Sequence, residues 1–298
     1  MDAAEKEVIS IMFKDHKSQL IELEKIANIK IDFGEGCVKK FLEFCERRNL
    51  FTHNDGVVNR RYLRNCDNYG LDISEVDLGQ KLQVTQEYFD ASVKATYELV
   101  TRIAQSIWRK MERTETERAD TSLNNVAYRL IERSEYKLAR KILRYAANEI
   151  THSDEFHRCM LIINHANAAK LDGDEAGASE ILSTVDWSAT GLNFQICVAA
   201  IRDDYGTVLR LLEPALKAEA ISKANLREWP VFKSIRTNEG FRSAFSKMFD
   251  EELMVADGTS ELGEGMKVGL PVAAVKFKKN KGAVSGESSN EEVPAKPA

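Results

Sequence analysis

The fold class is decided by residues 81–113, which read KLQVTQEYFDASVKATYELVTRIAQSIWRKMER. Apolar side chains recur there every three or four positions, at Phe89, Val93, Tyr97, Val100, Ala104, Ile107 and Met111. Because an α-helix has 3.6 residues per turn, this spacing places all of them on one stripe. The sequence therefore predicts a long amphipathic helix over 81–113, with Trp108 beside the stripe and in the core.

The rest of the chain is also helical by pattern. None of its five prolines falls in the first 213 residues, and proline breaks helix interiors by removing an amide donor. Apolar spacing predicts further helices over 4–28, 36–53 and 57–66, with a turn at 54–56 and a loop over 68–80. We therefore expect an all-α protein.

Composition excludes several classes of protein. Hydrophobic residues make up 43% of the 298, enough for a core, and five cysteines without CxxC spacing argue against disulfide scaffolds and zinc ribbons. No apolar run approaches the ~18 residues of a membrane span, and the N-terminus lacks a signal peptide's basic and apolar regions. We expect a cytoplasmic protein that binds no membrane. Nucleotide-binding, hydrolase and metal-ligand motifs are missing, so no cofactor or metal is expected.

The second half contains a loose internal repeat. Its pieces are AYRLIERSEYKLARKILRYA (127–146), ANAAKLDGDEAGASEILSTV (166–185) and ICVAAIRDDYGTVLRLLEPA (196–215). After each polar turn comes a short side chain (Ala139, Ala178, Val208) and, four residues later, a leucine (Leu143, Leu182, Leu212). These pieces resemble tetratricopeptide repeats, stacked helical hairpins of about 34 residues. The resemblance implies a helical array over 123–250, closed by residues 225–245, on which a protein partner binds.

The most informative segment for function is FCERRNLFTHNDGVVNRRYL (44–63). The whole chain has a net charge of −5, so it lacks the excess of basic residues that is typical of a nucleic-acid-binding domain. Residues 45–64, however, carry five arginines against two acids. These arginines are Arg47, Arg48, Arg60, Arg61 and Arg64. A second basic segment, 129–144, is interpreted as a solvated helix face that could instead guide RNA or a partner.

Arg48 and His53 together could cleave RNA without a metal. Histidine titrates near neutrality, so it can take the proton of a 2′-hydroxyl or protonate the leaving oxygen, and a guanidinium binds the developing phosphate charge. On a regular helix Asn49 and His53 lie about 40° apart, but Arg48 and His53 lie about 140° apart. They converge only if the helix end distorts or the Arg48 side chain wraps round. The alternative interpretation is an ordinary solvated basic face.

Arg48-Asn49-x3-His53 resembles the R-N-x3-H form of the motif of HEPN domains from bacterial and archaeal defence systems. NDGVVNRRYL after it, GQKLQVTQEYF (79–89) and WRK (108–110) extend the resemblance over residues 5–115. It implies a helical bundle that dimerises through its motif helices and, in active members, a metal-independent ribonuclease. Carried over, Arg48 binds the scissile phosphate, His53 transfers protons and Asn49 orients them. Arg47, Arg60, Arg61 and Arg64 are candidate substrate contacts.

These interpretations give a domain plan and two functions. We expect a HEPN-like bundle over 1–115, a polar link or helix cap over 116–122, the array over 123–250 and a disordered tail over 251–298. Only one long helix is predicted ahead of the motif helix, so the bundle either begins upstream of this chain or is completed by a partner. The first function is an antiviral defence or toxin endoribonuclease, a homodimer whose array senses a partner. The second is a non-catalytic dimeric scaffold that uses the array to bind a protein.

Overall fold

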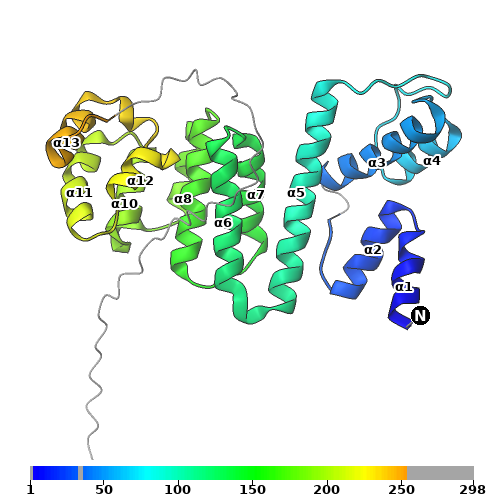
Figure 1. The fold of residues 1–298 in the computed structure, drawn as a ribbon, viewed down its shortest axis with the longest axis horizontal. Coiled ribbons are helices and arrows are strands. Elements are labelled where there is room, and N and C mark those ends of the chain that lie inside the picture. The colour runs from blue at the N-terminus through cyan, green and yellow to red at the C-terminus, as the bar shows by residue number, and fades with distance from the viewer. Residues whose placement is uncertain (1–2, 33–35, 254–298) are drawn as a thin grey trace, which may run out of the picture.

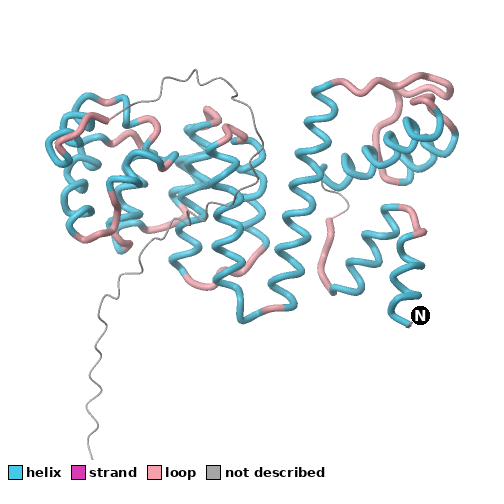
Figure 2. Tube along the Cα trace, viewed as in Figure 1, coloured by secondary structure: helices cyan, strands magenta, loops and turns pink. Residues whose placement is uncertain are grey.

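The computed structural model describes residues 3–32 and 36–253, and all regular structure in these two ranges is helical (Figures 1 and 2). This confirms the all-α fold class. The predicted tail over 251–298 lies outside the described residues from 254 onward, but its start was placed too early, because Leu253 is buried in the core. The α-helices are α1 (Ala3–Met12), α2 (His16–Ala27), α3 (Gly36–Asn54), α4 (Arg60–Asn68), α5 (Gln86–Met111), α6 (Thr116–Glu132), α7 (Tyr136–Glu149), α8 (Glu155–Leu171), α9 (Glu175–Ser183), α10 (Leu192–Ile201), α11 (Tyr205–Lys217), α12 (Lys223–Glu228) and α13 (Glu239–Phe249). Short 3-10 turns are η1 (Arg113–Glu115), η2 (Trp187–Ala189), η3 (Pro230–Phe232) and η4 (Ile235–Thr237).

Capping residues explain where the helices differ from the predicted ranges. The predicted helix over 4–28 is two helices, because the side chain of Asp15 accepts the amide of Ser18 and starts α2. In the same way Asn59 delays α4 to residue 60, and Thr85 delays the long helix to residue 86. Residues 116–122, predicted to be a polar link or a helix cap, are the first turns of α6.

The long helix α5 stands between the N-terminal helices and the remaining helices (Figure 1). Its buried apolar face is narrow: Ala95 and Leu99 join the core that includes Val38 and Leu42 of α3. The predicted apolar stripe faces another way, and its members Phe89 and Val100 are 46% and 56% exposed. Trp108, predicted to be core, is half-buried.

The helices from α6 to α11 form three hairpins, each closed by a three-residue turn. The first helices of the hairpins, α6, α8 and α10, pack in a row, and each second helix packs on its own first helix. All six positions singled out in the repeat are buried, which explains the pattern: short side chains let the helices approach, and leucines fill the space between them. Trp187 and Trp229 are buried packing residues.

The buried side chains gather in four apolar clusters, two built from residues up to 103 and two from residues after 122. Between these groups α5 contacts the hairpins largely through polar pairs. Glu98 is bound by Lys141 at 3.3 Å, and Arg102 binds Glu149 at 2.8 Å. Near the end of the helix Arg109 binds Asp120, which is fully buried, at 2.8 Å. The two parts of the chain are thus held in register by charge pairs rather than by a shared core.

Candidate active site

Helix α3 ends in a tight turn just after His53. Asp55 and Gly56 both have positive φ, at 50° and 76°, and the amide of Gly56 donates to Leu50 O at 3.1 Å. A side chain at residue 56 would meet the Phe51 ring at 3.1 Å in a backbone conformation that strongly favours glycine. Gly56 therefore fixes the point at which the motif helix stops.

A distant segment braces this turn. The amide of Leu82 donates to Gly56 O at 2.9 Å, and that of Val58 donates to Gln80 O at 2.8 Å. Residues 79–83 belong to the segment 79–89, which is part of the sequence resemblance to HEPN domains, and in the structure they have a local role. They hold the end of α3 in place against the loop that precedes α5.

Arg48, Asn49 and His53 lie on the last two turns of α3. The helix stays regular through Asn54, so the helix-end distortion that was one route to convergence does not occur. Instead the Arg48 guanidinium donates to the side-chain oxygen of Asn49 at 2.9 Å. Because Asn49 precedes His53 by one helical turn, this bond turns the guanidinium toward the face that carries His53. Arg48 and His53 are both exposed, and Asn49 is half-buried. The three side chains are accessible to a ligand in this chain.

Arg47 lies on the other side of the helix and is held by a polar cluster. Its Nε donates to Glu43 at 2.7 Å, and its guanidinium carbon lies 4.0 Å from the centre of the Tyr88 ring. The hydroxyls of Tyr62 and Tyr88 also donate to Glu43, at 2.7 and 2.5 Å. Burial is the largest single effect and disfavours the charged guanidinium, but Glu43, Tyr88 and Tyr62 together outweigh it and raise the pKa of Arg47. Through Glu43 and Tyr88, Arg47 belongs to a cluster that joins α3, α4 and α5.

The sequence interpretation missed Glu43, Tyr62 and Tyr88 as members of this cluster. The spacing of Glu43 and Arg47, four residues apart on one helix, is a signal that could have found the ion pair. Nothing in the sequence indicates that Tyr88, 45 residues further on, meets the same carboxylate. The Glu43 carboxylate accepts a hydrogen bond from each tyrosine hydroxyl, so both hydroxyls have a partner away from water. Burial and this carboxylate both raise the pKa values of Tyr62 and Tyr88.

Arg60, Arg61 and Arg64 lie on α4, immediately after the turn. All three are exposed and make no ion pair within residues 3–32 and 36–253. Helix α4 is fixed from beneath by Tyr62, which is buried and bonded to Glu43 of α3. The chain therefore presents unpaired positive charge on the helix that directly follows the Arg48, Asn49 and His53 group.

The array histidines have structural environments. His152 contacts Asp120 at 3.1 Å and the carbonyl of Ala146 at 3.0 Å, and His157 contacts Asp154 at 2.7 Å. Burial, with help from two arginines, lowers the pKa of His165 to about 4. Within the described ranges no group of three or more histidine, cysteine, aspartate or glutamate side chains could hold a metal ion.

No known protein family, curated protein or solved structure matches this chain. The helices in the described part are all too short or too polar to cross a lipid bilayer. An assignment of function therefore depends on the geometry of the α3 end and on the sequence resemblance alone.

Proposed function

We propose that this chain is a HEPN-type, metal-independent endoribonuclease of a defence or toxin system. The observation that carries the proposal is the group of Arg48, Asn49 and His53 at the end of α3, in which Arg48 and His53 are exposed and Arg48 is bonded to Asn49. An exposed guanidinium can bind a phosphate through two parallel donors, and an imidazole one helical turn from Asn49 can exchange a proton with a ribose hydroxyl.

The reaction runs by attack of the 2′-hydroxyl on the adjacent phosphate. His53 accepts the hydroxyl proton or donates one to the departing 5′-oxygen, and Arg48 stabilises the charge that develops on the phosphate. One histidine performs only one of these transfers in a single step, so a second copy of the chain supplies the other from its own motif helix. Exposed Arg60, Arg61 and Arg64 bind the neighbouring phosphates.

The hairpins from α6 to α11 are the proposed partner site. A protein that binds them affects the α3 site through α5, which contacts both α3 and α7. The charge pairs of Glu98 and Arg102 with α7 are the contacts that such a partner would disturb. The proposal therefore includes a cytoplasmic homodimer with RNA as substrate and a protein as regulator.

The test compares His53→Ala and Arg48→Ala with the wild type on single-stranded RNA of mixed sequence. Arg118→Ala is the matched control, because Arg118 is a 71% exposed arginine of α6 that pairs only locally with Glu115. We expect both motif variants to lose cleavage by at least a hundredfold, with unchanged circular dichroism, while the control cleaves normally. A chelator should not change the rate.

Cleavage that survives in purified His53→Ala would refute the proposed mechanism. No cleavage by the wild type at any concentration, with a stable dimer in solution, would support the dimeric scaffold instead. Sedimentation measured alongside the assay separates the two results, since the nuclease requires that activity rise with the dimer fraction.

A further inference from the structure

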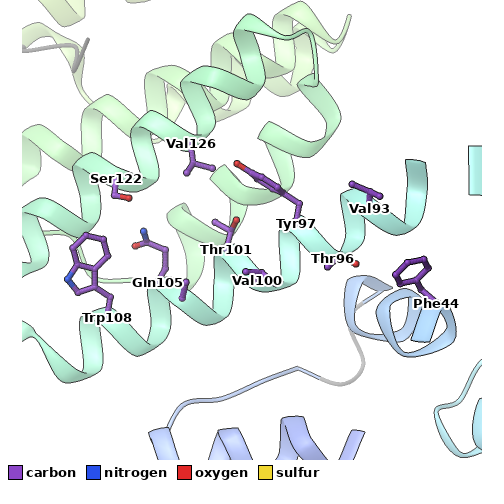
Figure 3. A pocket seen from close by; sticks show the side chains of 11 residues that line it. Phe44, Val93, Thr96, Tyr97, Val100, Thr101, Gln105, Trp108, Ser122 and Val126 are labelled. Atoms are coloured by element: carbon purple, nitrogen blue, oxygen red, sulfur yellow. The ribbon is translucent and has the colours of Figure 1, made fainter. Parts of the chain in front are cut away.

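An apolar groove runs along α5 on the face that carries the predicted stripe (Figure 3). Its floor is made by α5 side chains between residues 93 and 108, and its walls are Phe44 of α3 and Ser122 and Val126 of α6. The groove has a volume of about 560 Å³, and Val100 on its floor is 56% exposed. A groove of this kind accepts a row of apolar side chains from another helix.

Helix α1 presents such a row to the solvent. Val8, Ile9 and Met12 of α1 are exposed, and so is Phe13, which follows the helix directly. Phe13 is 88% exposed, more than any other large apolar side chain in the two described ranges. These four side chains form what we call the α1 ridge.

The α1 ridge has no cover in the described part of the chain. Helix α1 has 10 residues, and a helix of this length is marginally stable in water unless its apolar side chains pack on a neighbour. It packs on α2, and the ridge stays open to solvent. Contiguous exposed apolar side chains mark a binding surface, so we expect the ridge to be covered by a partner.

Within one chain the ridge and the groove are separate. Helix α1 lies beyond α2 and stands apart from α5 (Figure 1). The groove is bounded by α5, α3 and α6, so α1 would have to leave α2 to fill it. The ridge of a second copy faces away from its own α2 and meets no such restriction.

The two surfaces match in length and in chemistry. The 10 residues of α1 extend about 15 Å, and the groove floor from Val93 to Ala104 extends about 16 Å. The 11 side chains that line the groove are all uncharged. An apolar ridge can therefore enter the groove without leaving a charge buried and unpaired.

Reciprocal exchange provides enough contact for a dimer. Each chain has one ridge and one groove, so two chains related by a twofold axis can fill both grooves and cover both ridges. Burial of one apolar side chain removes roughly 60–120 Å² from water. Two contacts with four ridge side chains each, counted on both partners, bury on the order of 1,000 Å², which is the area that a specific interface requires.

We propose that α1 of one chain docks in the α5 groove of a second copy, and that the exchange is reciprocal. Docking covers the α1 ridge together with Val93, Tyr97 and Val100. It requires neither nuclease activity nor contact between the α3 ends of the two chains.

The test places the photo-crosslinker p-benzoylphenylalanine at residue 13 of the full-length chain, where it replaces another aromatic side chain. We expect a product with the mass of two chains, in which residue 13 is joined to a peptide within 93–108. Val93→Asp with Val100→Asp should lower its yield about tenfold or more, because docking would bury two unpaired carboxylates.

The matched control adds the same charge outside both surfaces. Leu209 of α11 and Met248 of α13 are exposed apolar side chains, and Leu209→Asp with Met248→Asp should leave the yield unchanged. Circular dichroism confirms that each variant remains folded.

A mixture of two variants shows whether ridge meets groove. One chain carries the crosslinker at residue 13 and the Val93→Asp and Val100→Asp changes, so its own groove is blocked. The other has an intact groove but carries Met12→Asp and Phe13→Asp. Mixing them should raise the yield about fivefold or more over the first chain alone, since one ridge and one groove remain complementary.

No rise in the mixture would overturn the proposal, because a contact between two α1 helices or two α5 helices is not restored by mixing. A crosslink within one chain, or to residues outside 93–108, would also overturn it. Cleavage of RNA is measured separately, so the nuclease and this exchange can each fail without the other.

Discussion

Asp120→Asn should strongly destabilise the protein, although it removes only one charge. Asp120 is fully buried on α6 and accepts four hydrogen bonds, from Arg109 at 2.8 Å, His152 at 3.1 Å, and the amide and hydroxyl of Ser153 at 2.7 and 2.8 Å. An asparagine keeps the shape but loses the charge and turns one oxygen into a donor facing other donors. Because Arg109 then remains buried without its counter-ion, we expect a loss of about 3–5 kcal/mol in the free energy of unfolding.

The pH dependence gives a second check on the same reasoning. Burial alone would raise the pKa of Asp120, but the bonds from His152, Ser153 and Arg109 outweigh it and hold the pKa well below its usual range. A carboxyl whose pKa is lowered by folding stabilises the protein above its unfolded pKa, about 3.9, and that stabilisation is lost as the pH falls toward the folded value. The difference between wild type and variant should therefore be constant from pH 7 to 5 and shrink below about pH 4.

Guanidinium unfolding, followed by circular dichroism over this pH range, measures both effects. Asp15→Asn is the matched control, since Asp15 caps α2 by accepting the amide and hydroxyl of Ser18 while remaining exposed. Asparagine caps helices about as well as aspartate, so the control should lose less than about 0.5 kcal/mol. An equal loss in both variants, or an Asp120 effect that persists unchanged at pH 3, would refute the account.

Three further outcomes follow from the same structure. Gly56→Ala should lower the free energy of unfolding by about 1–3 kcal/mol, and Gly79→Ala should lower it less. Both residues have positive φ, but only a side chain at residue 56 would contact the Phe51 ring. The denaturant midpoints of the two variants measure the difference. His165 should titrate near pH 4 in a proton NMR titration, and a midpoint above 6 would contradict its burial. Cys66 is fully buried and its pKa is raised to about 12, so it should react with a thiol reagent only on unfolding, and rapid modification at pH 8 would show that α4 opens.

The sequence predicted those features that depend on neighbours along the chain. The 3.6-residue period identified the helices, and the short residues and leucines of the repeat marked positions that prove buried in all three hairpins. The placement of Asn49 and His53 one turn apart also followed, because α3 is a regular helix over both residues. The HEPN resemblance, the nuclease and the dimer remain predictions.

Contacts between segments that are distant in the chain could not be predicted from the sequence. Residues 116–122 were predicted to be a polar link or a helix cap, but Asp120 is buried because Arg109 and the loop after α7 surround it. Likewise, the sequence marked Arg47 only as a candidate substrate contact, and the structure shows that Tyr88 and Glu43 hold it. Polarity in a single sequence indicates solvent exposure, and only the folded arrangement supplies the partners that let a charge be buried.

Helix α5 shows the division most clearly. Its sequence by itself determined that an amphipathic helix forms there, since the period of its apolar residues is a local property. Tertiary structure decided which face is buried: the small side chain of Ala95 lets α3 approach closely, and Glu98 and Arg102 bind α7, so the larger apolar stripe is left facing outward. Close packing and paired charges selected one face, and apolar area alone would have selected the other.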